Sequence, residues 1–277
     1  MKTNFLFKTG LAAAVVSTVL FACQKNAKTP VPPPTSSTEL SAQVKQSIAG
    51  MGFSTVDAHK VDGGYLVEGD ILLTDENLSE GTSGPVLRIA ESEQYRTTNL
   101  VKNLPRTITV SISNLPAVYG TATQNAIARY NALNLTLQFQ FVASGGQIQV
   151  VGFNQGPSGG YITLGSSGFP TRKGNPYGQI QMNTNAQAYG TNPDVNYLTS
   201  VLQHEMGHCI GFRHTDYFNR AYSCGGTPTN EGASNIGAIL IPGTPSAADA
   251  NSWMLACSNG GDRTFNTNDK VALNYLY

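Results

Sequence analysis

The chain has 277 residues, a formal net charge of zero and a charged fraction of only 12%. Such a sparse and balanced charge excludes the basic surface that nucleic-acid binding requires. The length allows one large domain and a small leading region. The 29 glycines suit a loop-rich exported protein.

Residues 1–23 have the pattern of an export signal. Lys2 and Lys8 give a positive start, and 10–21 form an apolar run that is too short to span a membrane. The run ends in LFAC, which resembles a bacterial lipobox with Cys23 as the lipidated residue. We therefore expect export and attachment to the cell surface or outer membrane through a lipid anchor alone. The alternative is a plain secretory signal that is cleaved nearby.

A Pro-rich tether and a small separate unit follow the signal. Residues 24–39 contain four prolines and no apolar periodicity, which is typical of an extended linker. Residues 40–96 begin with helical spacing of apolar side chains and continue with strand-like sequence at 64–73. His59 lies in a polar stretch of this unit, and we expect it on the surface.

Residues 97–277 form the large domain. Alternating apolar and polar residues predict strands here, and helical spacing predicts a helix. The order strand, helix, four strands and a second helix indicates an α+β fold. The predicted strands are 107–113, 135–141, 147–153, 160–164 and 179–182, and the first helix is 119–133.

The segment HEMGHCIGFRH, from His204 to His214, matches the pattern H-E-x-x-H-x-x-G-x-x-H at every fixed position. His204 and His208 are four residues apart, so both imidazoles project from one face of a helix. Gly211 permits a left-handed backbone at the helix end, which turns His214 back toward the same metal ion. The chain has only four histidines, and three of them fall in this pattern.

Three imidazole ligands indicate a catalytic zinc site, because zinc is four-coordinate and the fourth position stays open for water. Glu205 directly follows the first ligand, where its carboxylate can reach that water. We therefore expect Zn2+ to be bound by His204, His208 and His214. Glu205 is then the general base that takes a proton from the attacking water.

These residues resemble the metzincin metallopeptidases, whose zinc ligands lie above a tight turn that contains a methionine. Ser252-Trp253-Met254, forty residues after His214, is similar to that turn. The alternative is that Met254 is ordinary core filling. More closely, HEMGHCIGFRHTDY, IPGTP and NSWMLAC resemble the bacterial dual-action HEIGH metallopeptidases, over residues 40–277.

The resemblance implies a fold and an activity. The fold is a twisted mixed five-stranded sheet, a zinc helix and an irregular lower subdomain with a Met-turn and a closing helix. The activity is that of an exported zinc endopeptidase, which we expect to act as a monomer on a protein or peptide substrate. The substrate is expected to lie extended along an edge strand, here Tyr161 to Leu164, unless that stretch is an ordinary sheet edge.

The resemblance also implies that residues 40–96 are a propeptide. The sequence VEGDI, which ends at Ile71, resembles the Phe-x-Gly-Asp stretch in propeptides of astacin-like metzincins, where an aspartate occupies the open position on zinc. Asp70 is then a fourth ligand that keeps the precursor latent until cleavage near Arg96 or Arg106. The alternative is a Gly-Asp pair at an ordinary turn.

Cysteine usage fits an oxidising compartment. With Cys23 lipidated, three cysteines remain. Helical spacing places Cys209 away from the zinc ligands, so we expect a buried thiol. Cys224 and Cys257 are then the expected disulfide, although spacing alone does not fix the pairing.

Two other functions remain open. One is a non-catalytic module that binds surface polymers, and the other is a zinc hydrolase of a different polymer. The intact Glu205 favours chemistry over binding alone.

Overall fold

The computed structural model describes residues 39–51, 53–80, 94–158, 160–228, 230, 237–245 and 248–277. The expected export signal, Cys23 and almost all of the tether lie outside these ranges. Within them, no helix combines the length and apolar character needed to cross a membrane.

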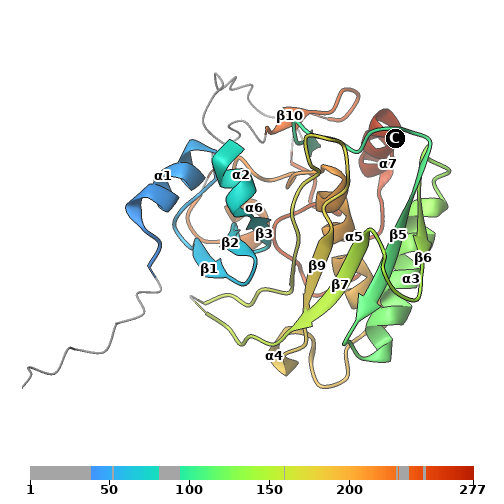
Figure 1. Ribbon diagram of the computed structural model, residues 1–277, viewed down its shortest axis with the longest axis horizontal. Helices are drawn as coiled ribbons and strands as arrows, with labels where there is room; N and C mark the ends of the chain where they lie inside the picture. The colour runs from blue at the N-terminus through green and yellow to red at the C-terminus, as the bar shows by residue number, and fades with distance from the viewer. Residues whose placement is uncertain are drawn as a thin grey trace, which may run out of the picture. The chain divides into compact units, whose positions relative to one another are not determined.

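Residues 39–80, called the N-terminal unit below, form a small sheet with two helices (Figure 1). The three strands pair antiparallel in chain order, which is the simplest meander. The core of the unit includes Ile48, Phe53 and Val67, and it also takes in Phe169 from the other part of the chain. The elements are α1 (Ala42–Gly50), β1 (His59–Val61), β2 (Gly64–Val67), β3 (Ile71–Leu73) and α2 (Asp75–Glu80).

Residues 94–277, called the C-terminal unit, are built on a five-stranded sheet in the order β6-β5-β7-β9-β8. Four of the strands run parallel, and β8 pairs antiparallel with β9 at one edge. The strands are β5 (Arg106–Ser113), β6 (Leu137–Phe141), β7 (Ile148–Phe153), β8 (Gly165–Ser166) and β9 (Gln179–Asn183).

Alternation along the strands decides which face of the sheet is covered. Ile108, Val110, Ile148 and Val150 are fully buried, whereas the intervening Thr109 is not. These side chains share one hydrophobic core with α3 (Ala117–Asn131) and α5 (Val195–Ile210). The two helices pack against each other on the same side of the sheet (Figure 1).

The predicted strand at 160–164 is wrong, because the edge strand lies just after it, at Gly165–Ser166. The carbonyl of Thr163 accepts a hydrogen bond from the Asn183 side-chain amide at 2.8 Å. The carbonyl of Leu164 accepts from the Tyr189 hydroxyl at 2.9 Å. The Asn183 side chain therefore holds the Thr163 carbonyl, which a longer strand would have paired. Leu164 also accepts a hydrogen bond from the backbone N–H of Asn183 at 2.9 Å, so pairing with β9 begins there. The other predicted elements of the C-terminal unit agree with the structure to within two residues, whereas the strand-like sequence at 64–73 forms two antiparallel strands, β2 and β3, joined by a turn.

Beyond α5 the chain is irregular, with short elements and a closing helix. The closing helix starts with a capping box, in which Asn266 and Asp269 each accept a hydrogen bond from the other's backbone N–H. The prediction of an α+β fold with a mixed five-stranded sheet is confirmed. The remaining elements are β4 (Tyr95–Arg96), α4 (Ala186–Tyr189), α6 (Ala221–Cys224), β10 (Ile239–Leu240) and α7 (Thr267–Leu276).

Candidate metal centre

Helix α5 and the turn after it bring the three histidines of the motif together. Asp194 caps the start of α5 by accepting hydrogen bonds from the backbone of Asn196 and Tyr197. Gly211 ends the helix with a φ of 112°, in the left-handed region. A Cβ at this position would also lie 2.7 Å from Leu100 Cδ2. The chain can therefore reverse here and return His214 to the face of α5 that carries the other two histidines.

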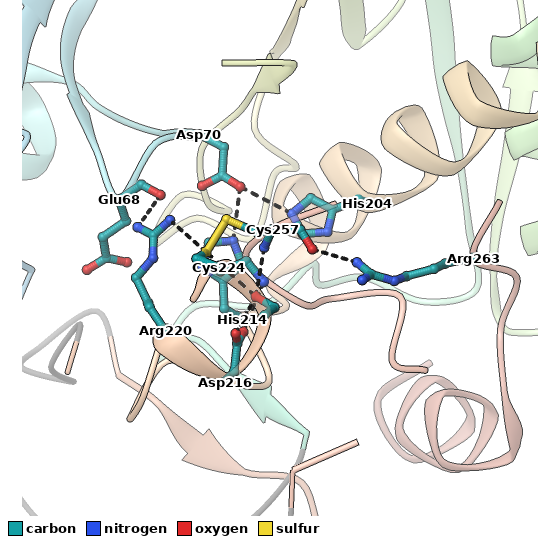
Figure 2. Close-up of a disulfide and its surroundings, with 11 residues drawn as sticks. Glu68, Asp70, His204, His214, Asp216, Arg220, Cys224, Cys257 and Arg263 are labelled. Carbon is teal, nitrogen blue, oxygen red and sulfur yellow. Dashed lines mark hydrogen bonds and ion pairs between the residues drawn. A yellow bond between two sulfur atoms is a disulfide. The ribbon is translucent and has the colours of Figure 1, made fainter. Parts of the chain in front are cut away.

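Four ligand-type atoms converge beside α5. One atom each from Asp70, His204, His208 and His214 lies within 4.8 Å of the other three. Asp70 Oδ2 is 3.1 Å from His214 Nε2 and 3.4 Å from His204 Nε2. His208 Nε2 is 3.2 Å from His214 Nε2. Figure 2 shows the Asp70 carboxylate pointing between two of the imidazoles, so a residue of the N-terminal unit completes the cluster.

Backbone carbonyls orient two of the imidazoles. His204 Nδ1 lies 2.9 Å from the carbonyl oxygen of Trp253, and His208 Nδ1 lies 2.8 Å from that of Phe212. A carbonyl oxygen only accepts, so each Nδ1 must carry the proton. The lone pair of each ring is then on Nε2, which faces the cluster. Hydrogen bonds of this kind hold a histidine ring in the orientation and tautomer that bind a metal ion.

The donor set fits zinc, which favours a tetrahedral shell of imidazole nitrogen and carboxylate oxygen. Among the described residues, His204 Nε2 and Asp70 Oδ1 are buried without a hydrogen-bond partner. Burial lowers the pKa of His208 well below its ordinary value, and the neighbouring His204 and His214 lower it further. His208 is therefore neutral, which is the form that binds a metal ion.

Glu205 lies at the edge of the cluster and is almost completely buried. Its Oε2 accepts a hydrogen bond from the hydroxyl of Ser167 at 2.7 Å. Burial raises the pKa of Glu205 well above its ordinary value, and the charge of Asp70 adds to this, whereas Ser167 opposes it. Burial alone would raise the pKa of Asp70 as well, but the histidines hold it well below its usual range. Ser167 is a contact that sequence patterns did not indicate.

The Ser252-Trp253-Met254 turn packs directly beneath α5. A Cβ added at Gly207 would lie 2.3 Å from the Trp253 ring and 2.8 Å from Met254 Sδ. Only glycine at this position of the motif lets the turn approach so closely. Met254 is fully buried, and its carbonyl accepts a hydrogen bond from the backbone of Thr215, next to the third histidine. The turn therefore supports the histidine cluster from below.

We expect Met254→Leu to lower the free energy of unfolding by less than about 1.5 kcal/mol, because the two side chains have similar volumes. Zinc content should stay unchanged. Denaturant unfolding and plasma emission analysis measure the two quantities, with Met182→Leu, at another buried methionine, as the control. Loss of zinc from the Met254 variant alone would contradict a packing role.

Asp269 of the closing helix is bonded to this turn. No sequence pattern indicated this contact. Its Oδ1 accepts from the side chains of Gln94 at 2.6 Å and Ser252 at 3.2 Å. Burial raises its pKa to about 7, against the hydrogen bonds that it accepts from Asn266 and Trp253. Gln94 is itself fully buried, so the start of the C-terminal unit is tied to the Met-turn.

A disulfide joins Cys224 and Cys257, 33 residues apart, beside the cluster (Figure 2). It lines a cavity of about 620 Å³, together with residues of both units. His59 also lines this cavity and is half-buried, so the prediction of a surface histidine is wrong. Cys209 is a buried free thiol, as predicted.

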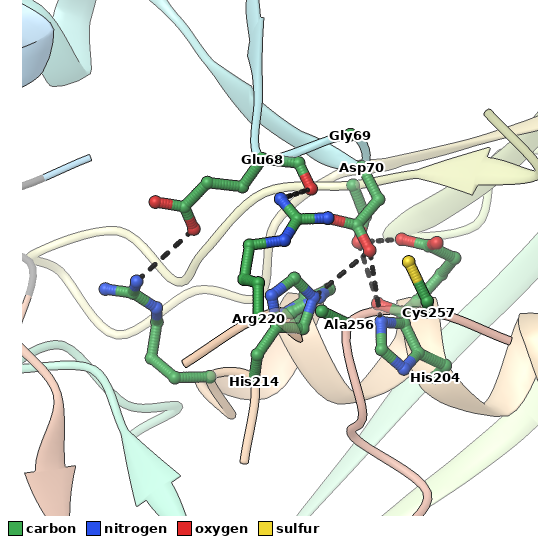
Figure 3. Close-up of polar contacts among 12 residues, drawn as sticks. Glu68, Gly69, Asp70, His204, His214, Arg220, Ala256 and Cys257 are labelled. Carbon is green, nitrogen blue, oxygen red and sulfur yellow. Dashed lines mark hydrogen bonds and ion pairs between the residues drawn. The ribbon is translucent and has the colours of Figure 1, made fainter. Parts of the chain in front are cut away.

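The chain around Asp70 is held along its length by the C-terminal unit (Figure 3). Arg220 donates to the carbonyl of Glu68, and Thr163 donates to the carbonyl of Gly69 at 3.0 Å. The buried side chains of Glu68 and Arg213 form an ion pair at 3.5 Å. Glu68 and Gly69 both have positive φ values, 55° and 89°, which make the turn that presents Asp70.

A comparison with family models identifies the chain. The model described as dual-action HEIGH metallo-peptidase matches residues 65–277. The chain belongs to the dual-action HEIGH metallopeptidase family. It is therefore a metallopeptidase, and zinc is the cofactor that its histidine cluster is suited to bind. The expected family and enzyme class are confirmed.

Solved structures show more remote similarity to this HEIGH metallopeptidase. Myroilysin is 17% identical with a TM-score of 0.40, and the match covers 65% of this chain and 86% of that one. High choriolytic enzyme 1, a hatching enzyme zinc-protease from Oryzias latipes (medaka fish), is 15% identical with a TM-score of 0.36, covering 61% and 88%. A comparison with curated proteins found no significant match.

Proposed function

We propose that this metallopeptidase is an endopeptidase that is made as a latent precursor, with Glu205 as general base and Asp70 as the latency ligand. The observation that carries the proposal is the distance of 3.1 Å between the Asp70 carboxylate and His214, inside the cluster of three histidines. A carboxylate is a good zinc ligand, and at this position it competes with the water that hydrolysis needs.

When bound, zinc supplies a Lewis acid that polarises a peptide carbonyl and lowers the pKa of water. Three histidines from α5 and the following turn provide the ligands that remain after Asp70 leaves. The carboxylate of Glu205 lines the cavity beside them. There Glu205 takes the proton from the attacking water and passes it to the leaving amine.

The N-terminal unit also blocks the site through its backbone. The amide of Ser167 donates to the carbonyl of Asp70 at 2.9 Å, and the amide of Leu72 donates to the carbonyl of Ser167 at 2.8 Å. The unit therefore occupies the free side of the sheet edge beside the cluster. An extended substrate needs the same backbone groups for strand addition, which supports a latent state.

We propose that activating cleavage occurs on the N-terminal side of Gln94, rather than near Arg96 or Arg106. Gln94 and Tyr95 are fully buried, and the amide of Thr97 donates to the carbonyl of Gly211 at 2.8 Å. Arg106 begins β5, where its side chain donates to the Gly174 carbonyl at 3.0 Å. Cleavage at either arginine would cut a segment that the C-terminal unit needs for its own packing.

Turnover of casein or a labelled peptide by the processed chain tests the proposed activity. We expect hydrolysis that a zinc chelator abolishes and that added zinc restores, because the three histidines alone should still bind the metal. The control is the same assay with Glu205→Gln. Zinc binding without hydrolysis of any peptide would favour a surface-binding module or a hydrolase of another polymer.

We also propose that the enzyme is exported and held on a membrane by lipid on Cys23, as the lipobox-like sequence suggests. Cys23→Ser should move the protein from the membrane fraction to the soluble fraction, because no other anchor is expected. Cell fractionation and intact mass measure the result. Unchanged membrane association, or a wild-type mass without lipid, would contradict the anchor.

A further inference from the structure

Ser167 contacts both Glu205, the proposed general base, and residues 70–72 of the N-terminal unit, called the blocking segment below. Its side chain is fully buried. Its hydroxyl lies 2.7 Å from Oε2 of Glu205 and 3.0 Å from the backbone carbonyl of the same residue. At 2.7 Å the shorter contact has the usual length of a good O–H···O hydrogen bond. One oxygen of the carboxylate is therefore fixed by Ser167.

The other oxygen of the carboxylate lies beside Gly165, where a larger side chain would crowd it. A Cβ added at Gly165 would lie 3.0 Å from Oε1 of Glu205 and 3.1 Å from its Cγ. The edge of the sheet therefore donates a hydroxyl to one oxygen of the carboxylate and places a glycine, which has no side chain to displace it, beside the other. Together these two neighbours limit the rotation of the Glu205 side chain, whose carboxylate must point toward the attacking water.

The backbone of Ser167 is where the blocking segment is attached. Its N–H and C=O both bond to the N-terminal unit, to Asp70 and Leu72 respectively, in a parallel bridge. These two groups face away from β9, which pairs with the preceding residue, Ser166. When the N-terminal unit leaves, they become available to an extended peptide. The backbone of Ser167 thus bonds to the blocking segment, and its side chain bonds to Glu205.

We propose that Ser167 is a positioning residue, which aims the carboxylate of Glu205 with its hydroxyl and aligns the substrate backbone with its own amide and carbonyl. This rests on the proposed function. Ser167 then contacts both the substrate backbone and the Glu205 carboxylate. One residue therefore sets the distance between the scissile peptide bond and the carboxylate that accepts the proton. Misalignment of such groups lowers the rate of the chemical step more than it weakens binding.

Ser167→Ala tests the side-chain role in the processed enzyme, because it removes the hydroxyl and keeps the backbone. We expect kcat to fall about tenfold or more, as for loss of a hydrogen bond to a charged group, with KM within about twofold and zinc content unchanged. Ser167→Thr should restore most of the rate. Ser111→Ala removes another buried hydroxyl that accepts from a backbone amide, and it should leave kcat unchanged.

A kcat within about twofold of wild type for Ser167→Ala, or no rescue by threonine, would overturn the proposal. A readout without turnover separates it from the proposed function. Crystal structures of wild type and Ser167→Ala should show one orientation of the Glu205 carboxylate in the first and a rotated or divided one in the second. An unchanged carboxylate would refute positioning even in an active enzyme. A chain that hydrolyses no peptide would refute only the peptidase, because the carboxylate orientation would still report on Ser167.

Discussion

Replacing Glu205 with alanine should leave zinc in place and lower turnover by about 10²–10⁴-fold, the usual cost of losing a general base. Zinc stays because the carboxylate is not a member of the ligand cluster, which consists of Asp70 and the three histidines. Turnover of a labelled peptide and plasma emission analysis of zinc measure the two effects on the processed chain.

Glu205→Gln separates proton transfer from packing. Glutamine keeps the size of the side chain and can still accept the hydrogen bond from Ser167, but it cannot take a proton at neutral pH. We expect it to be as inactive as the alanine variant. Either variant with more than about a tenth of the wild-type rate would show that another group is the base.

Replacing Asp70 with alanine should make the uncleaved precursor active, by about tenfold or more over the wild-type precursor. A tethered ligand acts at an effective concentration of the order of millimolar, and the substitution removes that competition with water. Peptide turnover is measured before processing, with intact mass showing that the N-terminal unit is still attached. Latency would then be relieved without any cut in the chain.

Asp62→Ala is the matched control for this experiment. Asp62 belongs to the same unit, is exposed and lies outside the ligand cluster, so its loss should leave the precursor silent. Full latency of the Asp70 variant would mean that the backbone bonds to Ser167 suffice to block the site. A structure of the precursor with Asp70 away from the metal would exclude it as a ligand.

The features of the fold and of the metal site that the sequence predicted depend on the spacing of residues within one helix or strand. The interval between His204 and His208 is one helical turn, and Gly211 supplies a left-handed residue where the helix ends. Strand alternation is likewise local, and it located β5 and β7 almost to the residue. Each of these patterns comes from the backbone geometry of a single element.

The parts that sequence could not predict depend on contacts between distant residues. Ser167 and Glu205 are 38 residues apart, and nothing near either one indicates the other. The link from Gln94 to Asp269 spans 175 residues. The prediction of a strand at 160–164 was wrong for the same reason, because the side chain of Asn183, 20 residues away, holds the carbonyl of Thr163.

The place of Phe169 would make the proposed activation a one-way step. Its ring stacks on Phe53 at 6.4 Å within the core of the N-terminal unit, although it belongs to the C-terminal unit. The unit is close to the size, about 40 residues, below which a chain rarely sustains a fold by its own core. Once severed, the unit would lose this aromatic side chain from its core and unfold. A released N-terminal unit without its folded shape would not return to the cleft, so its removal alone would keep the proposed enzyme active.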